Sequence, residues 1–156
     1  MCEGLRARGF RLTPQRLAIV HLFSEDGSHP TAQDLFARLR PAFPTMSFAT
    51  VYNTLDALAQ AGLSSSLRLG ALNGLGAATR FDPNTEPHHH AVCDRCGVVV
   101  DLPVDSLAAP QVDARKVRTQ SQGFRVRTVE TIYRGTCAGC RSRPSLPPLP
   151  NVTPEA

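Results

Sequence analysis

Four of the five cysteines of this chain form two Cys-x2-Cys pairs, and these pairs constrain the fold more than any other sequence feature. They are Cys93 with Cys96 and Cys137 with Cys140, separated by 40 residues. Each pair can offer two thiolates to one tetrahedral zinc ion, and four sulfurs close its coordination shell. Because the interval is longer than in a compact zinc finger, we expect a structural zinc site that joins two strand ends across one domain.

Paired cysteines also occur as thioredoxin-like redox centres and as reversible disulfides. Neither alternative explains why two matched pairs occur in one chain, so the sequence favours zinc. The remaining cysteine, Cys2, has no expected role.

Composition argues against a membrane protein and against a secreted protein. The 156 residues contain no apolar run of about eighteen residues or more, and the segment before Thr13 lacks the apolar part of a signal peptide. We therefore expect a cytoplasmic protein that does not enter a membrane, where thiol pairs bind metals more often than they form disulfides. The formal net charge of +4 permits nucleic-acid binding without requiring it.

Capping signals predict three helices in the first half of the chain. A threonine or serine that can act as an N-cap opens each helix, at Thr13, Thr31 and Ser47. Pro14 after the first cap and Asp34 three residues after the second strengthen these assignments. The expected helical ranges are 15–23, 32–39 and 47–61.

Apolar residues recur at helical spacing within these ranges and predict the core. They are Leu17, Ile19, Val20, Phe23, Leu35, Phe36, Leu39, Val51, Leu55 and Leu58. Gly62 takes the position of a C-terminal glycine cap. Two β-like segments, 65–69 and 78–81, then flank a glycine-rich turn and predict a hairpin. Three helices and a hairpin are typical of a winged helix-turn-helix, although three amphipathic helices also occur as a plain helical core.

The pattern changes to strands after residue 83. Strand-like runs cover 91–93, 98–102 and 124–134, with a helical stretch over 105–122. We therefore predict an α+β protein, with a winged-helix domain over 1–82, a hinge over 83–87 and a small α+β domain over 88–141. Residues 142–156 hold five of the 13 prolines and are expected to be a disordered tail.

Three consecutive histidines precede the first cysteine pair. In an extended segment, His88 and His90 point to one side and the middle histidine to the other. Two imidazoles on one face suit a divalent transition metal, although a solvated histidine run has the same sequence. Asp82 before the run and Asp101 after it favour a metal site, and His29 is a further candidate ligand.

The order of the motifs resembles the ferric uptake regulator (Fur) family over residues 5–141. The matching segments are, in chain order, TPQR, HPTA, SFATVYNTL, RFD, HHHAVC, VVVD and the second cysteine pair. Within this family the chain is most similar to the peroxide-sensing PerR branch. The resemblance implies a dimeric bacterial repressor of transcription that binds double-stranded operator DNA, with an N-terminal winged helix and a C-terminal dimerisation domain.

The resemblance also implies roles for single residues. Structural Zn²⁺ would be held by Cys93, Cys96, Cys137 and Cys140, and regulatory Fe²⁺ or Mn²⁺ by His29, Asp82, His88, His90 and Asp101. Peroxide sensors carry Asp at position 101, where iron and zinc sensors commonly carry Glu. With iron bound, peroxide would oxidise His29 or His88. The third metal site of some relatives is expected to be absent, because position 89 is histidine and none follows His90.

The helix over 47–61 is the expected DNA-reading element. Tyr52 and Asn53 lie in its N-terminal half, and asparagine can read adenine with two hydrogen bonds, although Tyr52 also fits core packing. Arg16, Arg68 and Arg80 are expected phosphate contacts, although each also fits a plain surface charge. The wing segment over 71–77 is longer than in typical relatives, so its contacts are expected to differ.

Three rival functions are open. An iron- or manganese-responsive regulator of metal uptake would use the same ligands without sensing peroxide. A thiol redox switch would act through the cysteine pairs and release zinc on oxidation. A zinc enzyme is disfavoured, because four cysteines leave no open coordination position and the histidine and aspartate set is saturated, so we predict no enzymatic activity.

Overall fold

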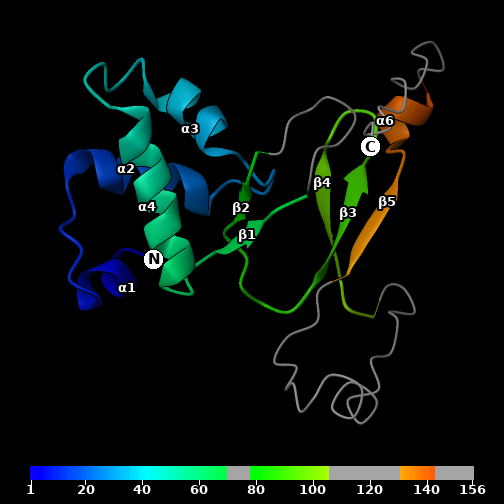
Figure 1. The fold of residues 1–156 in the computed structure, drawn as a ribbon, viewed down its shortest axis with the longest axis horizontal. Coiled ribbons are helices and arrows are strands. Elements are labelled where there is room, and N and C mark those ends of the chain that lie inside the picture. The colour runs from blue at the N-terminus through cyan, green and yellow to red at the C-terminus, as the bar shows by residue number, and fades with distance from the viewer. Residues whose placement is uncertain (70–77, 106–130, 143–156) are drawn as a thin grey trace, which may run out of the picture.

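The computed structural model describes residues 1–69, 78–105 and 131–142 (Figure 1). Its helices are α1 (Cys2–Ala7), α2 (Pro14–Ser24), α3 (Ala32–Leu39), α4 (Phe48–Gln60) and α6 (Ala138–Arg141). Its strands are β1 (Ser65–Leu67), β2 (Arg80–Asp82), β3 (His89–Cys93), β4 (Val99–Leu102) and β5 (Ile132–Gly135). Over these ranges, no helix has the length and hydropathy that crossing a membrane requires.

The three predicted helices begin at their predicted caps. The side chains of Thr13 and Ser47 each accept a hydrogen bond from the backbone N–H three residues further on. Thr31 and Asp34 form a complete capping box, in which each side chain accepts from the other residue's backbone N–H. These bonds satisfy N–H groups that the first turn of a helix leaves unpaired, which explains why the starts could be predicted.

Helix α4 ends in a Schellman motif centred on Gly62. This glycine has φ +64°, its N–H donates to the Ala59 carbonyl at 2.9 Å, and the Leu63 N–H donates to the Leu58 carbonyl at 2.9 Å. The left-handed backbone conformation is accessible to glycine without steric cost. The predicted glycine cap is therefore confirmed.

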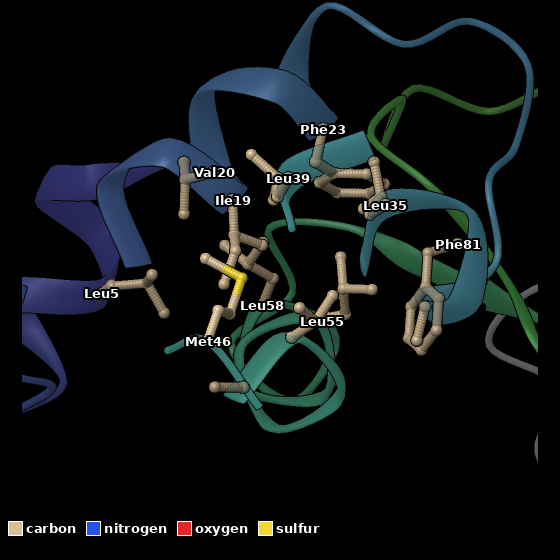
Figure 2. Packing of buried hydrophobic residues seen from close by; sticks show 13 residues of the cluster. Leu5, Ile19, Val20, Phe23, Leu35, Leu39, Met46, Leu55, Leu58 and Phe81 are labelled. Carbon is tan, nitrogen blue, oxygen red and sulfur yellow. The ribbon is translucent and has the colours of Figure 1, made fainter. Parts of the chain in front are cut away.

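An apolar cluster between α2, α3 and α4 forms the core of the first half (Figure 2). Ile19, Phe23, Leu35, Leu55 and Leu58 are fully buried in it. These side chains were all predicted to face inward from their spacing. The cluster fixes the three helices as one body on which the following strands can be placed.

Two residues of the helical half differ from expectation. Leu17, predicted in the core, is 39% exposed, because at 100° per residue it lies about 160° around α2 from Ile19. Leu5 is fully buried although no helix was predicted there, and its side chain packs the short α1 against the core (Figure 2). Helix α1 has no side-chain cap bond, so the sequence held no start signal for it.

Two small sheets follow the helices. Strands β1 and β2 pair antiparallel, with Ser66 opposite Phe81, which confirms the two arms of the predicted hairpin. In the second sheet the order is β4-β3-β5, with β3 antiparallel to β4 and parallel to β5. The helices, the β1–β2 pair and the second sheet make the predicted α+β architecture.

Several predictions fall outside the described residues. These are the turn with Gly70, Gly74 and Gly76, the longer wing segment, all of the 105–122 helix except residue 105, the first part of the 124–134 strand, and nearly all of the tail. Within the described part, β5 starts at Ile132 and completes that strand.

The second sheet contacts the β1–β2 pair directly. Leu67 and Leu69, in and just after β1, pack with Val92 and Val99 of the second sheet in a small buried cluster. The Arg134 guanidinium on β5 also donates to the Leu69 carbonyl at 2.7 Å. In Figure 1 the β1–β2 pair accordingly lies between the helices and the second sheet.

Candidate metal centres

The four paired cysteines converge at one end of the second sheet. Cys93 ends β3, Cys96 lies in the turn before β4, Cys137 precedes α6 and Cys140 lies within it. Parallel pairing places Cys93 of β3 opposite Gly135 of β5, and so brings together two pairs that are 40 residues apart in sequence. All four sulfur atoms lie within 4.8 Å of one another.

Backbone hydrogen bonds shape the first cysteine turn. The Gly97 N–H donates to the Cys93 carbonyl at 2.8 Å, and the Cys93 N–H donates to the Val98 carbonyl at 3.0 Å. Gly97 has φ +71°, a conformation that favours glycine. The turn therefore directs the Cys93 and Cys96 side chains to the same side.

The spacing of the sulfurs fits tetrahedral zinc. The Cys96 and Cys137 sulfurs are 3.7 Å apart, and zinc–sulfur bonds of about 2.3 Å give a tetrahedron with edges of about 3.8 Å. All five cysteines are free thiols, so the structure forms none of the disulfides considered as an alternative.

Electrostatics of the thiol cluster also favour a cation. Burial alone would raise the pKa of Cys93, but the backbone N–H groups of Cys137, Cys96 and Arg95 lower it to about 6. The Cys96 thiol, followed by burial and the other two thiols, raises the pKa of Cys140 to about 12. One thiolate forms readily here, whereas four so close together need a positive ion between them.

A second cluster joins residues from both halves of the chain. Its ligand atoms belong to His29 before α3, Asp82 at the end of β2, His88 before β3, His90 in β3 and Asp101 in β4. One nitrogen or carboxylate oxygen of each lies within 4.8 Å of all the others. The structure therefore brings together all five residues proposed for the regulatory site.

The separations fit ligands around one ion. His29 Nε2 is 2.7 Å from Asp101 Oδ1, and His88 Nε2 is 2.9 Å from both Asp82 Oδ2 and His90 Nε2. The other imidazole–carboxylate separations lie between 3.5 and 4.0 Å. Ligands about 2.1 Å from a shared ion are about 3 to 4 Å apart, so the cluster needs only small adjustments to bind one.

Two buried candidate ligand atoms lie close to other atoms of the cluster but make no hydrogen bond. His29 and Asp82 are each 1% exposed, and neither His29 Nε2 nor Asp82 Oδ2 makes a hydrogen bond, although both lie within 3 Å of another ligand atom. Polar atoms buried in this way are destabilising. A metal ion at the centre would satisfy both, and this is the strongest sign that the cluster is a metal site.

Protonation states in the cluster suit a cation. Burial lowers the pKa of His29, against the opposing effect of Asp101 and Asp82, and so favours its neutral, metal-binding form. Burial alone would raise the pKa of Asp82, but the nearby His90 imidazole, the Asn84 backbone N–H and the charges of His29 and His88 hold it below its usual value. The site combines neutral imidazole with ionised carboxylate, a ligand set of intermediate hardness.

Outer contacts orient three of the ligands. His88 Nδ1 lies 2.6 Å from the Glu86 carbonyl, which leaves Nε2 facing the centre. Asn84 donates from its backbone N–H to Asp82 Oδ1 at 2.7 Å and from its side chain to Asp101 Oδ2 at 3.4 Å, and these bonds leave the second oxygen of each carboxylate for the site. Asn84 was not among the residues predicted from the sequence, and the Asp-Pro-Asn turn before the histidine run was the available signal.

His89 lies outside the cluster, on the opposite side of β3. Its ring makes an edge contact with Tyr133 of β5, with centroids 6.0 Å apart, and it is 6% exposed. This agrees with the alternation expected for an extended histidine run.

The residues proposed for DNA binding lie on α2, on α4, just after β1 and on β2. Tyr52 is 43% exposed and its ring contacts Phe81, while Asn53 and Arg68 are exposed. Arg16 donates to the Arg11 carbonyl at 2.6 Å. Arg80 donates to the His29 carbonyl at 2.9 Å, a contact that was not predicted from the sequence. Contacts of all these residues with DNA stay predictions.

Comparisons with known proteins agree on one family. The sequence model of the Ferric uptake regulator family matches residues 7–134. The chain is 36% identical over 141 residues to the peroxide operon regulator of Bacillus subtilis (strain 168), covering 90% of this chain and 91% of that protein. It is 40% identical over 99 residues to the peroxide-responsive repressor PerR of Staphylococcus epidermidis (strain ATCC 12228 / FDA PCI 1200), covering 64% of this chain and 63% of that protein.

A solved structure supports the fold. The Helicobacter pylori ferric uptake regulator Fur, described as having three functional metal-binding sites, matches with a TM-score of 0.64 and 18% identity. The match covers 89% of this chain and 87% of that one.

Proposed function

As this chain belongs to the ferric uptake regulator family, we propose that it is a metal-dependent repressor of transcription that binds double-stranded operator DNA and responds to peroxide. The observation that carries the proposal is the five-residue cluster, in which ligands from both halves of the chain converge on one point. The similarity of the chain to the peroxide regulators supports peroxide as the signal.

The two clusters suit different metals. Four thiolates in a tetrahedron favour Zn²⁺ and leave no open position, so the zinc would be structural. Three imidazoles and two carboxylates favour Fe²⁺ or Mn²⁺ as the regulatory ion. We propose the ligand sets that the family resemblance implied, with Cys93, Cys96, Cys137 and Cys140 in the first site and His29, Asp82, His88, His90 and Asp101 in the second.

The regulatory site spans the proposed hinge over 83–87. His29 and Asp82 precede the hinge and the other three ligands follow it, so binding of all five fixes the proposed winged-helix domain against the second sheet. We call this arrangement the closed form. An ion shifts the protein toward the closed form only to the extent that it binds the closed form more tightly than the open one. The closed form would set the winged helices of a dimer at the spacing of two operator half-sites.

The second sheet offers a surface for a second copy of the chain. Val98 and Val100 are 38% and 49% exposed. They line a shallow apolar groove together with residues of β3 and β5, including Ala91 and Tyr133. Exposed apolar surface of this kind supports the proposed homodimer.

Peroxide sensitivity would depend on the metal. A bound Fe²⁺ would supply the one-electron reduction of hydrogen peroxide, chemistry that Mn²⁺ would not supply under the same conditions. The imidazoles of His29 and His88 border the centre of the site and are the groups we propose to become oxidised. An oxidised imidazole binds a metal poorly, so the closed form would be lost and repression relieved.

DNA binding with each metal tests this proposal. Duplexes selected from a random pool in the presence of Mn²⁺ serve as the probe, and binding is followed by fluorescence anisotropy without oxygen. We expect both metal forms to bind, and only the Fe²⁺ form to lose binding after peroxide. Peptide mass spectrometry should then find one added oxygen on His29 or His88.

Other outcomes identify the rival functions. Metal-dependent binding that peroxide leaves unchanged in both forms would contradict peroxide sensing and identify a plain iron- or manganese-responsive regulator. Loss of binding together with release of zinc would identify a thiol switch at the cysteine pairs. Failure to select any DNA with either metal would contradict the proposed repressor function itself.

A further inference from the structure

The backbone of His29 adopts an unusual conformation. Its φ is +54°, and among the described residues it is the only one other than glycine with a positive φ. The next residue, Pro30, further restricts the conformations that His29 can adopt. Such a conformation persists only where its surroundings hold it, and it points to a local functional constraint. Here it directs a buried imidazole into the regulatory cluster.

Strand β2 holds this backbone in place. The Arg80 guanidinium donates to the His29 carbonyl at 2.9 Å, and the Phe81 N–H donates to the Pro30 carbonyl at 3.0 Å. Thr31 and Arg80 also form an antiparallel β-bridge. The bond from Arg80 is the only one of these three contacts that depends on a side chain, so a substitution can remove it and leave the backbone contacts.

The same strand carries a second ligand. Asp82 follows Arg80 by two residues, and its carboxylate is 3.8 Å from His29 Nε2. Fixing the His29 carbonyl to Arg80 therefore sets the distance between two ligands that are 53 positions apart in sequence. This is the role of an outer contact that orients a metal ligand.

We infer that Arg80 is a positioning residue of the regulatory metal site, and that it acts through the backbone of His29. This inference rests on the proposed function, because it concerns the affinity of that site for Mn²⁺ or Fe²⁺. It is separate from any contact of Arg80 with DNA phosphate, since it applies to the protein without DNA.

The test is a titration of zinc-loaded protein with Mn²⁺ alone, without DNA, by isothermal titration calorimetry. We expect Arg80→Ala to weaken Mn²⁺ binding at least about tenfold. The direction is informative, because removing a positive charge near a cation site would by electrostatics alone tighten binding. Arg80→Lys, which keeps the charge and one donor, should recover part of the loss. Equal or tighter binding by Arg80→Ala would overturn the inference.

Control variants separate positioning from folding and from general charge. Arg40→Ala removes an exposed positive charge at the end of α3 and should bind Mn²⁺ as wild type does. Zinc content and circular dichroism of Arg80→Ala should match wild type. The double variant His29→Ala/Arg80→Ala should bind Mn²⁺ as His29→Ala does, because Arg80 acts through His29, and a further loss in the double variant would contradict this route. Wild type that binds no Mn²⁺ would instead contradict the proposed function.

Discussion

At the scale of single residues, cysteine occurs in two distinct settings in this chain. Cys96 is exposed at the tip of a turn, yet its sulfur lies 3.7 Å from that of Cys137 in the thiol cluster. Cys2 is partly buried and packs against the helical core, far in sequence from the cluster. Burial alone therefore does not distinguish a cysteine of the thiol cluster from a packing residue, whereas pairing in sequence does.

Substitution of one thiol should separate these roles. We expect Cys96→Ser to lose most of the bound zinc and to lower the melting temperature by about 10 °C or more, because three remaining thiols hold the ion much less tightly. Zinc content by mass spectrometry and thermal unfolding by circular dichroism measure the two effects. Cys2→Ser is the matched control and should keep its zinc, and equal zinc content in both variants would argue against a four-cysteine site.

At the scale of elements, helix boundaries in this chain follow local hydrogen bonding. Helices α2, α3 and α4 begin at side-chain caps that sequence alone reveals, and α4 ends where Gly62 enters the left-handed conformation. Helix α1 lacks such a cap and is held by packing. A Cβ on Gly4 would lie 2.7 Å from Leu63 Cδ1, so α1 rests closely on Leu63, three residues after the last residue of α4.

The end of α4 gives a clean test of backbone conformation. A Cβ at Gly62 would meet no heavy atom within 4 Å, so substitution there adds no clash. We expect Gly62→Ala to lower the free energy of unfolding by about 1 kcal/mol, through the left-handed conformation alone. Gly62→Asn should lower the free energy of unfolding by less than Gly62→Ala does, because asparagine tolerates this conformation better than alanine. Urea unfolding measures both values, and equal stability of wild type and Gly62→Ala would contradict the assignment.

At the scale of the whole molecule, the regulatory cluster joins the helical half of the chain to the second sheet. The small cluster of Leu67, Leu69, Val92 and Val99 and the bond from Arg134 also join them. An ion in the five-residue site would add to these contacts and would bind only the closed arrangement with all five ligands.

Binding of Mn²⁺ should therefore stabilise the protein as a whole. At a Mn²⁺ concentration 100 times its dissociation constant, we expect the free energy of unfolding of zinc-loaded protein to rise by about 2.7 kcal/mol. Its melting temperature should rise by about 5–10 °C. Differential scanning calorimetry measures the rise. Mg²⁺, which prefers oxygen ligands, should give a much smaller effect, and so should Mn²⁺ added to His88→Ala. Equal rises with His88→Ala would contradict binding at this cluster.

The sequence alone determined the helix starts, the Gly62 cap, the hairpin arms and the alternation of His88 and His90. These features depend on hydrogen bonds and side-chain directions within a few residues, so they are visible in a short window. Spacing within a helix was less decisive, since Leu17 stands three residues before the buried Val20 yet is itself exposed.

Only the tertiary structure decided how the candidate sites are assembled. Parallel pairing of β3 with β5 brings the two cysteine pairs together, and β2 carries Asp82 and Arg80 to His29. The sequence proposed the ligand sets from residue types and a family resemblance, but it gave no sign of Arg80 or Asn84 as their supports. Contacts between residues so distant depend on the packing of the whole chain, which no local pattern records.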